Sequence, residues 1–131
     1  MRLRPASLLT VLLALSIALL ACGGNNRALQ SVAVSPAAAT SSQAQFTATG
    51  VYNSMPTSVD ITGTTTWCIG SSSGVCDGNI AQRAFVSAGL AQCEQGFAGT
   101  VTVLAGQKGP APGPDQGYQL QPFGTAQLTC P

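Results

Sequence analysis

The stretch Gly99-Thr100-Val101-Thr102-Val103-Leu104-Ala105 decides the fold class of this chain. Threonines alternate in it with valines, so Val101 and Val103 share one face and the threonines share the other. This two-residue period is typical of a β-strand that lies over an apolar core. We therefore expect a strand over 99–105 with both valines buried.

Similar short segments occur on both sides of this strand. They lie at 31–35, 45–52, 64–69, 84–87, 90–93 and 125–130. The expected inward side chains are Val32, Val34, Phe46, Ala48, Tyr52, Trp67 and Ile69. We expect 31–35 to be an edge strand, because Pro36 stops it. We expect 64–69 to be a central strand and Phe85 to face outward.

The connecting segments are rich in turn residues. The segment 37–43 is small and polar and predicts a crossover, 53–57 holds Pro56, and 70–74 is a Gly/Ser loop. Residues 106–117 contain three prolines and predict an extended loop. No window after Cys22 shows a 3.6-residue period. About seven short strands joined by turns predict an all-β sandwich.

The N-terminus has the pattern of an export signal. Arg2 and Arg4 precede a mostly apolar run over 8–20, and Cys22 follows Ala21. A transmembrane helix is the first alternative, but it needs roughly 20 apolar residues. A plain secretory signal cut after Ala21 is the second alternative, and it would leave Cys22 as a free thiol.

Leu19-Leu20-Ala21-Cys22 resembles the bacterial lipobox, in which the cysteine receives diacylglycerol before cleavage. The resemblance implies a signal peptide over 1–21, a lipid-modified Cys22, a flexible tether over 22–29 and a domain over 30–131. Two or more acyl chains hold a protein stably at a membrane. Gly23 stands where an aspartate would favour the inner membrane, so the resemblance favours the outer membrane.

The charge balance after the leader is close to neutral. This part of the chain has three cationic and four anionic side chains. The cations are Arg27, Arg83 and Lys108, and the anions are Asp60, Asp77, Glu94 and Asp115. Nucleic-acid binding requires a clustered basic surface, so nucleic acid is not an expected partner. The sequence has no basic patch for anionic lipid either. The expected contact with the membrane is the lipidated Cys22.

Four cysteines follow Cys22, namely Cys68, Cys76, Cys93 and Cys130. An even number in an oxidising compartment predicts two disulfides. Zinc is the alternative, but the Cys68–Cys76 spacing is too wide and the chain has no histidine. Of three possible connectivities we favour Cys68–Cys76, which a hairpin can close. Cys93–Cys130 then follows by elimination.

The sequence offers no convincing active site. With no histidine, and only Lys108 after the leader as an amine base, a nucleophilic serine lacks activation. The four acids lie far apart in sequence, and Asp77-Gly78-Asn79 lacks the later carboxylates of a calcium loop. Trp67 suits core packing better than sugar stacking. We expect a protein without enzymatic activity, metal or cofactor.

Several segments in order resemble the bacterial Ig-like domain of group 2, the module of intimin- and invasin-type adhesins. They are Leu29–Pro36, Gln45–Gly50, Thr66-Trp67, Ala84–Ala91, Ala98–Val103 and Ala126–Thr129. The resemblance implies an Ig-like β-sandwich that serves as a spacer or binding module and has no shared catalytic residues. This chain adds four cysteines and a Pro/Gly insertion in the final hairpin.

The loop after residue 106 is the expected partner-binding segment, because long loops at the end of a sandwich often bind. Its candidate contact residues are Lys108, Asp115, Tyr118 and Phe123. A tolerated insertion without function is the alternative. We expect a lipid-anchored interaction module of the bacterial cell envelope, with adhesion as one role and a protein or glycan as ligand. A structural spacer in an envelope complex is the second hypothesis, and a small secreted enzyme or inhibitor is the third.

Overall fold

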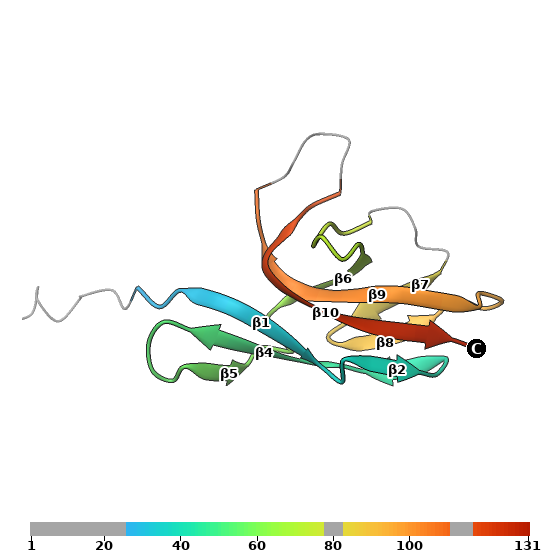
Figure 1. The fold of residues 1–131 in the computed structure, drawn as a ribbon, viewed down its shortest axis with the longest axis horizontal. Helices are drawn as coiled ribbons and strands as arrows, with labels where there is room; N and C mark the ends of the chain where they lie inside the picture. Colours follow the sequence, from blue (N-terminus) through green and yellow to red (C-terminus); the bar gives the residue numbers. More distant parts are fainter. Residues whose placement is uncertain (1–25, 78–82, 111–116) are drawn as a thin grey trace, which may run out of the picture.

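A computed structural model describes residues 26–77, 83–110 and 117–131, which form ten β-strands and no helix (Figure 1). The strands are β1 (Leu29–Ser35), β2 (Ala38–Thr40), β3 (Gln43–Gln45), β4 (Thr47–Tyr52), β5 (Ser58–Asp60), β6 (Thr66–Gly70), β7 (Ala84–Ser87), β8 (Leu90–Cys93), β9 (Gly99–Lys108) and β10 (Leu120–Cys130). Within these ranges, no helix is long and apolar enough to cross a membrane. The expected signal peptide over 1–21 and Cys22 lie outside the described residues.

The strands form three sheets, with the orders β1-β4-β5, β2-β10-β9-β6 and β3-β8-β7. Neighbouring strands are antiparallel except β2 and β10, which pair in parallel. The all-β prediction is therefore correct, although the chain forms more strands and sheets than the sequence indicated. As predicted, β1 is an edge strand of its sheet.

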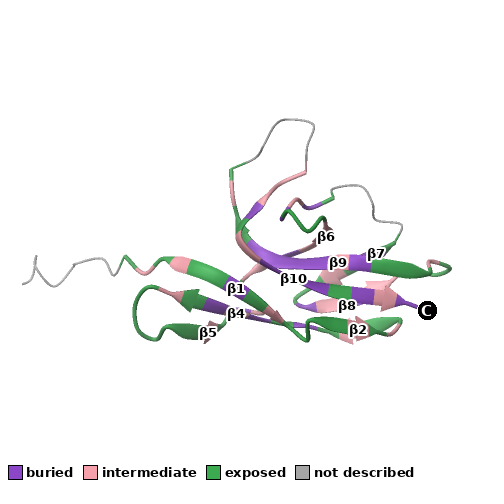
Figure 2. Ribbon diagram, viewed as in Figure 1, coloured by how far each residue is buried: buried purple, intermediate pink, exposed green. Residues whose placement is uncertain are grey.

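The β9–β10 hairpin is the longest pair in the fold, and its looped end bends away from the other strands (Figure 1). The predicted burial of Val101 and Val103 is correct, with 5% and 0% of their surface exposed. On the opposite face of β9, Leu104 packs with Cys76 and Leu120 in a second, smaller cluster. Successive residues of β9 therefore contribute to two apolar clusters, and Figure 2 shows a continuous buried stretch along this strand.

The main core lies between the three sheets and draws residues from each of them. Its large members include Phe46, Trp67, Val103 and Leu128. Ala48 and Phe46 are fully buried, as alternation predicted, and Trp67 is a core residue. Burial of this apolar surface, at roughly 25 cal/mol per Å², is the main favourable contribution to folding. Phe85 faces outward as expected, with 48% of its surface exposed.

Two segments in the first half of the domain depart from the sequence prediction. The expected crossover over 37–43 contains β2, whose backbone pairs with the edge of β10 from Ala38↔Gln127 to Thr40↔Thr129. Small polar residues carry no alternation, so this backbone pairing left no signal in the sequence. The expected strand over 45–52 is two strands, because β3 pairs with β8 and β4 pairs with β1 on either side of Phe46.

Other departures concern the position and length of strands. The prediction that 64–69 forms a central strand is wrong, because β6 is the edge of its sheet and pairs only with β9. The short strand β5 was not expected. Residues 106–108 belong to β9 rather than to an extended loop, because Gly106 and Lys108 pair with residues of β10.

The β7–β8 hairpin closes through the two-residue turn Ala88-Gly89. Both residues have positive φ, 48° for Ala88 and 81° for Gly89, as two-residue hairpin turns with the correct twist require. A Cβ on Gly89 would lie 2.2 Å from the carbonyl oxygen of Phe46. The backbone N–H of Phe46 also donates to the Gly89 carbonyl at 2.8 Å. The turn therefore holds Phe46, the residue that separates β3 from β4.

Candidate functional site

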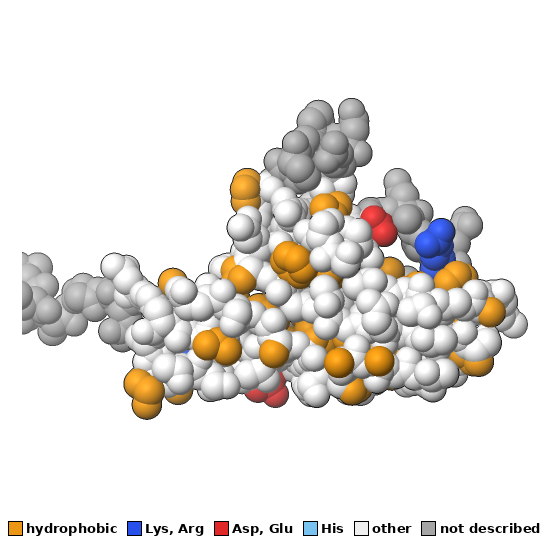
Figure 3. All heavy atoms as spheres, in the orientation of Figure 1, with side chains coloured by type: hydrophobic (Ala, Val, Ile, Leu, Met, Phe, Trp, Pro, Cys, Tyr) orange, Lys and Arg blue, Asp and Glu red, His pale blue; other side chains and the backbone are white. Residues whose placement is uncertain are grey.

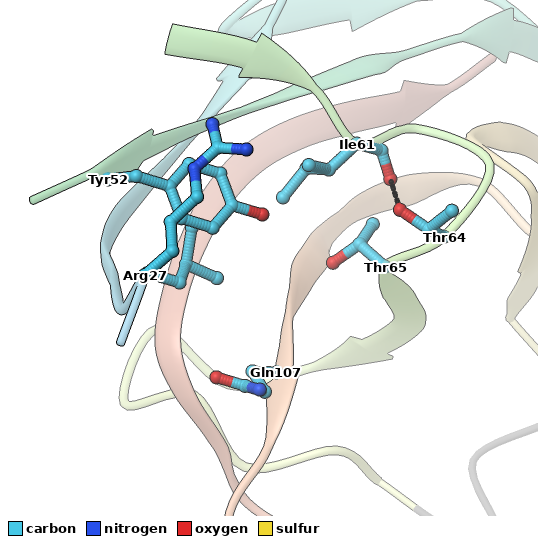
Figure 4. A pocket seen from close by; sticks show the side chains of 7 residues that line it. Arg27, Tyr52, Ile61, Thr64, Thr65 and Gln107 are labelled. Carbon is cyan, nitrogen blue, oxygen red and sulfur yellow. Dashed lines mark hydrogen bonds between the residues drawn. The ribbon is translucent and has the colours of Figure 1, made fainter. Parts of the chain in front are cut away.

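A cavity of about 170 Å³ opens where the start of β1, the end of β4, the segment after β5 and the end of β9 meet. It is lined by Arg27, Leu29, Tyr52, Ile61, Thr64, Thr65 and Gln107 (Figure 4). This volume is small beside the roughly 300–1,000 Å³ of sites for drug-sized molecules. The cavity suits one small polar group.

Arg27 closes one side of the cavity by stacking on Tyr52. Its guanidinium carbon lies 4.0 Å from the centre of the Tyr52 ring, a cation–π contact. The guanidinium also donates a hydrogen bond from Nη2 to the carbonyl oxygen of Pro56. Its Nε is buried and has no hydrogen-bond partner among the described residues. Figure 4 shows the guanidinium over the Tyr52 ring.

Asn53 holds the chain around Arg27 in place. Its Oδ1 accepts the backbone N–H of Ala28 at 2.9 Å, and its own N–H donates to the Ala28 carbonyl at 3.2 Å. Its Nδ2 donates to the carbonyl of Asn26 at 3.3 Å. Residues 26–29, the last part of the expected tether, are therefore attached to the turn that follows β4.

The floor of the cavity is apolar and its walls carry hydroxyl groups. Thr65 Oγ1 donates to the carbonyl of Gly106 at 2.9 Å, and Thr64 Oγ1 donates to that of Ile61 at 3.4 Å. The hydroxyl groups of Tyr52 and Thr65 face each other across the space (Figure 4). These lining residues comprise one cation and no carboxylate, so the cavity suits a neutral or anionic group.

Gly50 allows the apolar floor to form. A Cβ at this position would lie 2.8 Å from Leu29 Cδ1 and 3.1 Å from Ile61 Cδ1. Tyr52 Cε2 would also be only 3.1 Å away. A side chain at position 50 would therefore displace three residues that line the cavity.

The structure contains the two disulfides that we favoured. Cys68 and Cys76 are joined with their Cα atoms 5.7 Å apart, and Cys93 and Cys130 are joined with theirs 5.9 Å apart. The first closes a short loop after β6. The second joins β8 to β10, which belong to different sheets.

The candidate partner-binding residues have different environments. Lys108 is exposed at the end of β9, and its Nζ lies 4.5 Å from the centre of the Tyr118 ring. Tyr118 and Phe123 are partly buried and pack against the cluster of Cys76, Leu104 and Leu120. Phe123 belongs to β10. Asp115 lies outside the described residues.

Two further residues considered from the sequence have clear surroundings. Trp67 is 9% exposed, so it packs in the core and does not form a sugar-stacking surface. Asp77 lines a second cavity, of about 200 Å³, with Arg83, Thr100 and Thr102. Among residues 26–77, 83–110 and 117–131, no three His, Cys, Asp or Glu side chains lie close enough to hold a metal ion.

The sequence did not indicate the cavity. Arg27 belonged to an expected tether, Tyr52 to an expected core face, and Thr64 and Thr65 to an expected strand. Two features of the sequence were relevant: Arg27 is the first charged residue after the expected leader, and Asn53 belongs to a predicted turn. Only the folded chain brings these two residues together. No protein-family model matches this chain, and no curated protein is significantly similar to it.

Proposed function

We propose that this protein is a lipid-anchored, non-catalytic interaction module of the bacterial cell envelope. The observation that carries the proposal is the Leu19-Leu20-Ala21-Cys22 motif, which precedes a small β domain with two disulfides. Disulfides persist in oxidising compartments, which agrees with export across the inner membrane. The absence of an aspartate after Cys22 favours the outer membrane.

We infer further that the domain is an Ig-like sandwich. Ig domains place strands A, B, E and D in one sheet and C, F and G in the other. The order β10-β9-β6 agrees with G-F-C, while β1-β4 agrees with A-B and β3-β8-β7 with B-E-D. In this assignment strand B is broken at Phe46. Trp67 on β6 agrees with the buried tryptophan that Ig domains carry on strand C.

The proposed contact surface for a protein or glycan partner is the looped end of the β9–β10 hairpin. Lys108 at the end of β9 and Tyr118, two residues before β10, form a cation–π pair beside this loop. The end of β9 and the start of β10, which flank this loop, bend away from the other strands (Figure 1). A structural spacer in an envelope complex is the second candidate function, and the same tether and sandwich serve it equally well.

Lipid attachment can be tested by labelling cells with a clickable fatty acid. The full chain should incorporate the label, and Cys22→Ser should not. Thr10→Ser is the matched control, because it changes the leader but keeps Cys22, and it should be labelled like the wild type. Equal label in the wild type and in Cys22→Ser would overturn the lipid anchor.

The interaction role can be tested by shortening 110–116 to a two-residue turn in the anchored protein. Loop closure costs only about 0.6 kcal/mol per doubling of length, so stability should barely change. Cross-linking in intact cells should then lose the partner while the protein stays folded. Retention of the same partner by the shortened chain would favour the spacer function.

A further inference from the structure

The described domain begins very close to the proposed anchor. Only residues 23–25 separate Cys22 from Asn26. Four residue steps of at most about 3.6 Å allow no more than about 14 Å between these two Cα atoms. Asn26 and Ala28 are hydrogen-bonded to Asn53, so the turn between β4 and β5 is held near the anchor as well.

This same end exposes apolar side chains. Among the described residues, the exposed large hydrophobic side chains are Val51, Met55 and Phe85, at 39%, 83% and 48% of their surface. Val51 is in β4, and Met55 is in the β4–β5 turn. Two of the three therefore belong to the end of the domain that the tether enters. Because both side chains lie at the end nearest to the proposed anchor, a surface that contacts this end would cover both of them.

A cation lies beside Met55, one of these two side chains. The Arg27 guanidinium reaches the β4–β5 turn through its hydrogen bond to the Pro56 carbonyl, next to Met55. The carboxylate of the β4–β5 hairpin is Asp60. It lies opposite Thr49 in the strand register, at the end of the hairpin away from the turn. Figure 3 shows few charged side chains on the face that it draws. A guanidinium is suited to a phosphate, because its charged N–H groups form strong hydrogen bonds to phosphate oxygens.

We propose that the end of the domain formed by Arg27, Val51 and Met55 rests on the phospholipid surface of the leaflet that holds the Cys22 anchor. Arg27 meets a lipid phosphate, and Met55 enters the interface between headgroups and acyl chains. One cation and two apolar side chains would bind a membrane weakly on their own. They suffice here because the anchor makes the contact intramolecular and raises the effective concentration of lipid. This inference rests on the proposed lipid anchor.

The first experiment reads the environment of position 55 in a bilayer. The lipidated full chain is reconstituted in vesicles of equal parts phosphatidylethanolamine and phosphatidylglycerol. Met55→Cys carries a polarity-sensitive dye, and Phe85→Cys with the same dye is the matched control on β7. The dye at position 55 should be blue-shifted, and nitroxide headgroups should quench it several-fold more strongly than the dye at position 85. Equal quenching and a water-like emission at both positions would overturn the inference.

The second experiment tests the charge. Arg27→Gln should reduce the quenching at position 55 at least two-fold, and Arg83→Gln, which removes the same charge elsewhere, should leave it unchanged. Circular dichroism checks that both variants are folded. An equal response to the two substitutions would overturn the role of Arg27.

The outcomes separate this inference from the anchor on which it rests. Protein that carries no fatty acid and leaves the vesicles overturns the proposed anchor and the contact with it. Protein that stays anchored while position 55 is exposed to water overturns the contact alone. Shielding of position 55 in cells but not in pure lipid would show that another protein covers this end, which also contradicts the inference.

Discussion

The backbone carbonyl of Thr62 accepts the indole N–H of Trp67, with 2.9 Å between Nε1 and the oxygen. The same residue makes further hydrogen bonds through its hydroxyl and its backbone N–H. Its hydroxyl accepts the backbone N–H of Ala48 at 2.9 Å, and its own N–H donates to Asp60 Oδ1 at 2.8 Å. Thr62 therefore connects β4, β5 and the core tryptophan of β6 without belonging to a strand itself.

Thr62→Val should destabilise the domain by about 1–3 kcal/mol, because the buried N–H of Ala48 loses its acceptor. Thr62→Ser keeps a hydroxyl at the same place and should cost less than about 1 kcal/mol. Urea unfolding of the two variants measures the difference. A loss on Thr62→Ser as large as that on Thr62→Val would contradict the leading role of the hydroxyl at this site.

Hydrogen bonds from the Thr62 hydroxyl and from the Thr62 backbone N–H lower the pKa of Asp60 below its usual value in the folded protein. Because the folded pKa lies below the unfolded pKa, this stabilisation is present above about pH 4 and is lost as the pH falls through the folded pKa. Asp60→Asn should therefore show a weaker loss of stability on acidification than the wild type. Urea unfolding between neutral pH and about pH 3 measures it, with Asp77→Asn as the control at an exposed carboxylate.

The two disulfides should differ in their contribution to stability. Cys93–Cys130 spans 37 residues and Cys68–Cys76 spans 8. The chain-entropy estimate is about 4 kcal/mol for the first and about 2.5 kcal/mol for the second. Each pair is replaced by two alanines, so that both variants lose the same atoms, and urea unfolding compares them. A larger loss from the shorter loop would contradict this account.

The Ala88-Gly89 turn predicts two changes of opposite sign. Gly89→Ala should cost more than about 1 kcal/mol, because φ is positive and the new Cβ would collide with the Phe46 carbonyl. Ala88→Asn should stabilise by about 0.5 kcal/mol, since asparagine tolerates positive φ better than alanine does. Thermal melting of both variants is the measurement. Destabilisation by Ala88→Asn would be inconsistent with this turn geometry.

Local alternation identified most of the long strands but not their partners. Val101, Val103, Phe46 and Ala48 are buried as expected, because each belongs to a segment with a clear two-residue period. The parallel pairing of β2 with β10 and the edge position of β6 depend on backbone hydrogen bonds between distant segments. No side-chain pattern within either segment encodes such a choice.

The cavity was harder to predict for a related reason. Arg27 has no periodic neighbours, and its position follows from the hydrogen bonds between Asn53 and residues 26–28. The disulfide pairs, by contrast, could be predicted. A short Gly/Ser loop brings Cys68 and Cys76 together locally, and the remaining pair then followed.

The parallel β2–β10 pair has a mechanical consequence. The start of β1 and the end of β10 lie at opposite ends of the domain in Figure 1, and β2 continues from β1 in the direction of β10. A force that pulls the start of β1 away from Cys130 therefore slides β2 along β10. The three residue pairs from Ala38↔Gln127 to Thr40↔Thr129 are then loaded together in shear, and they must break at the same time instead of one after another.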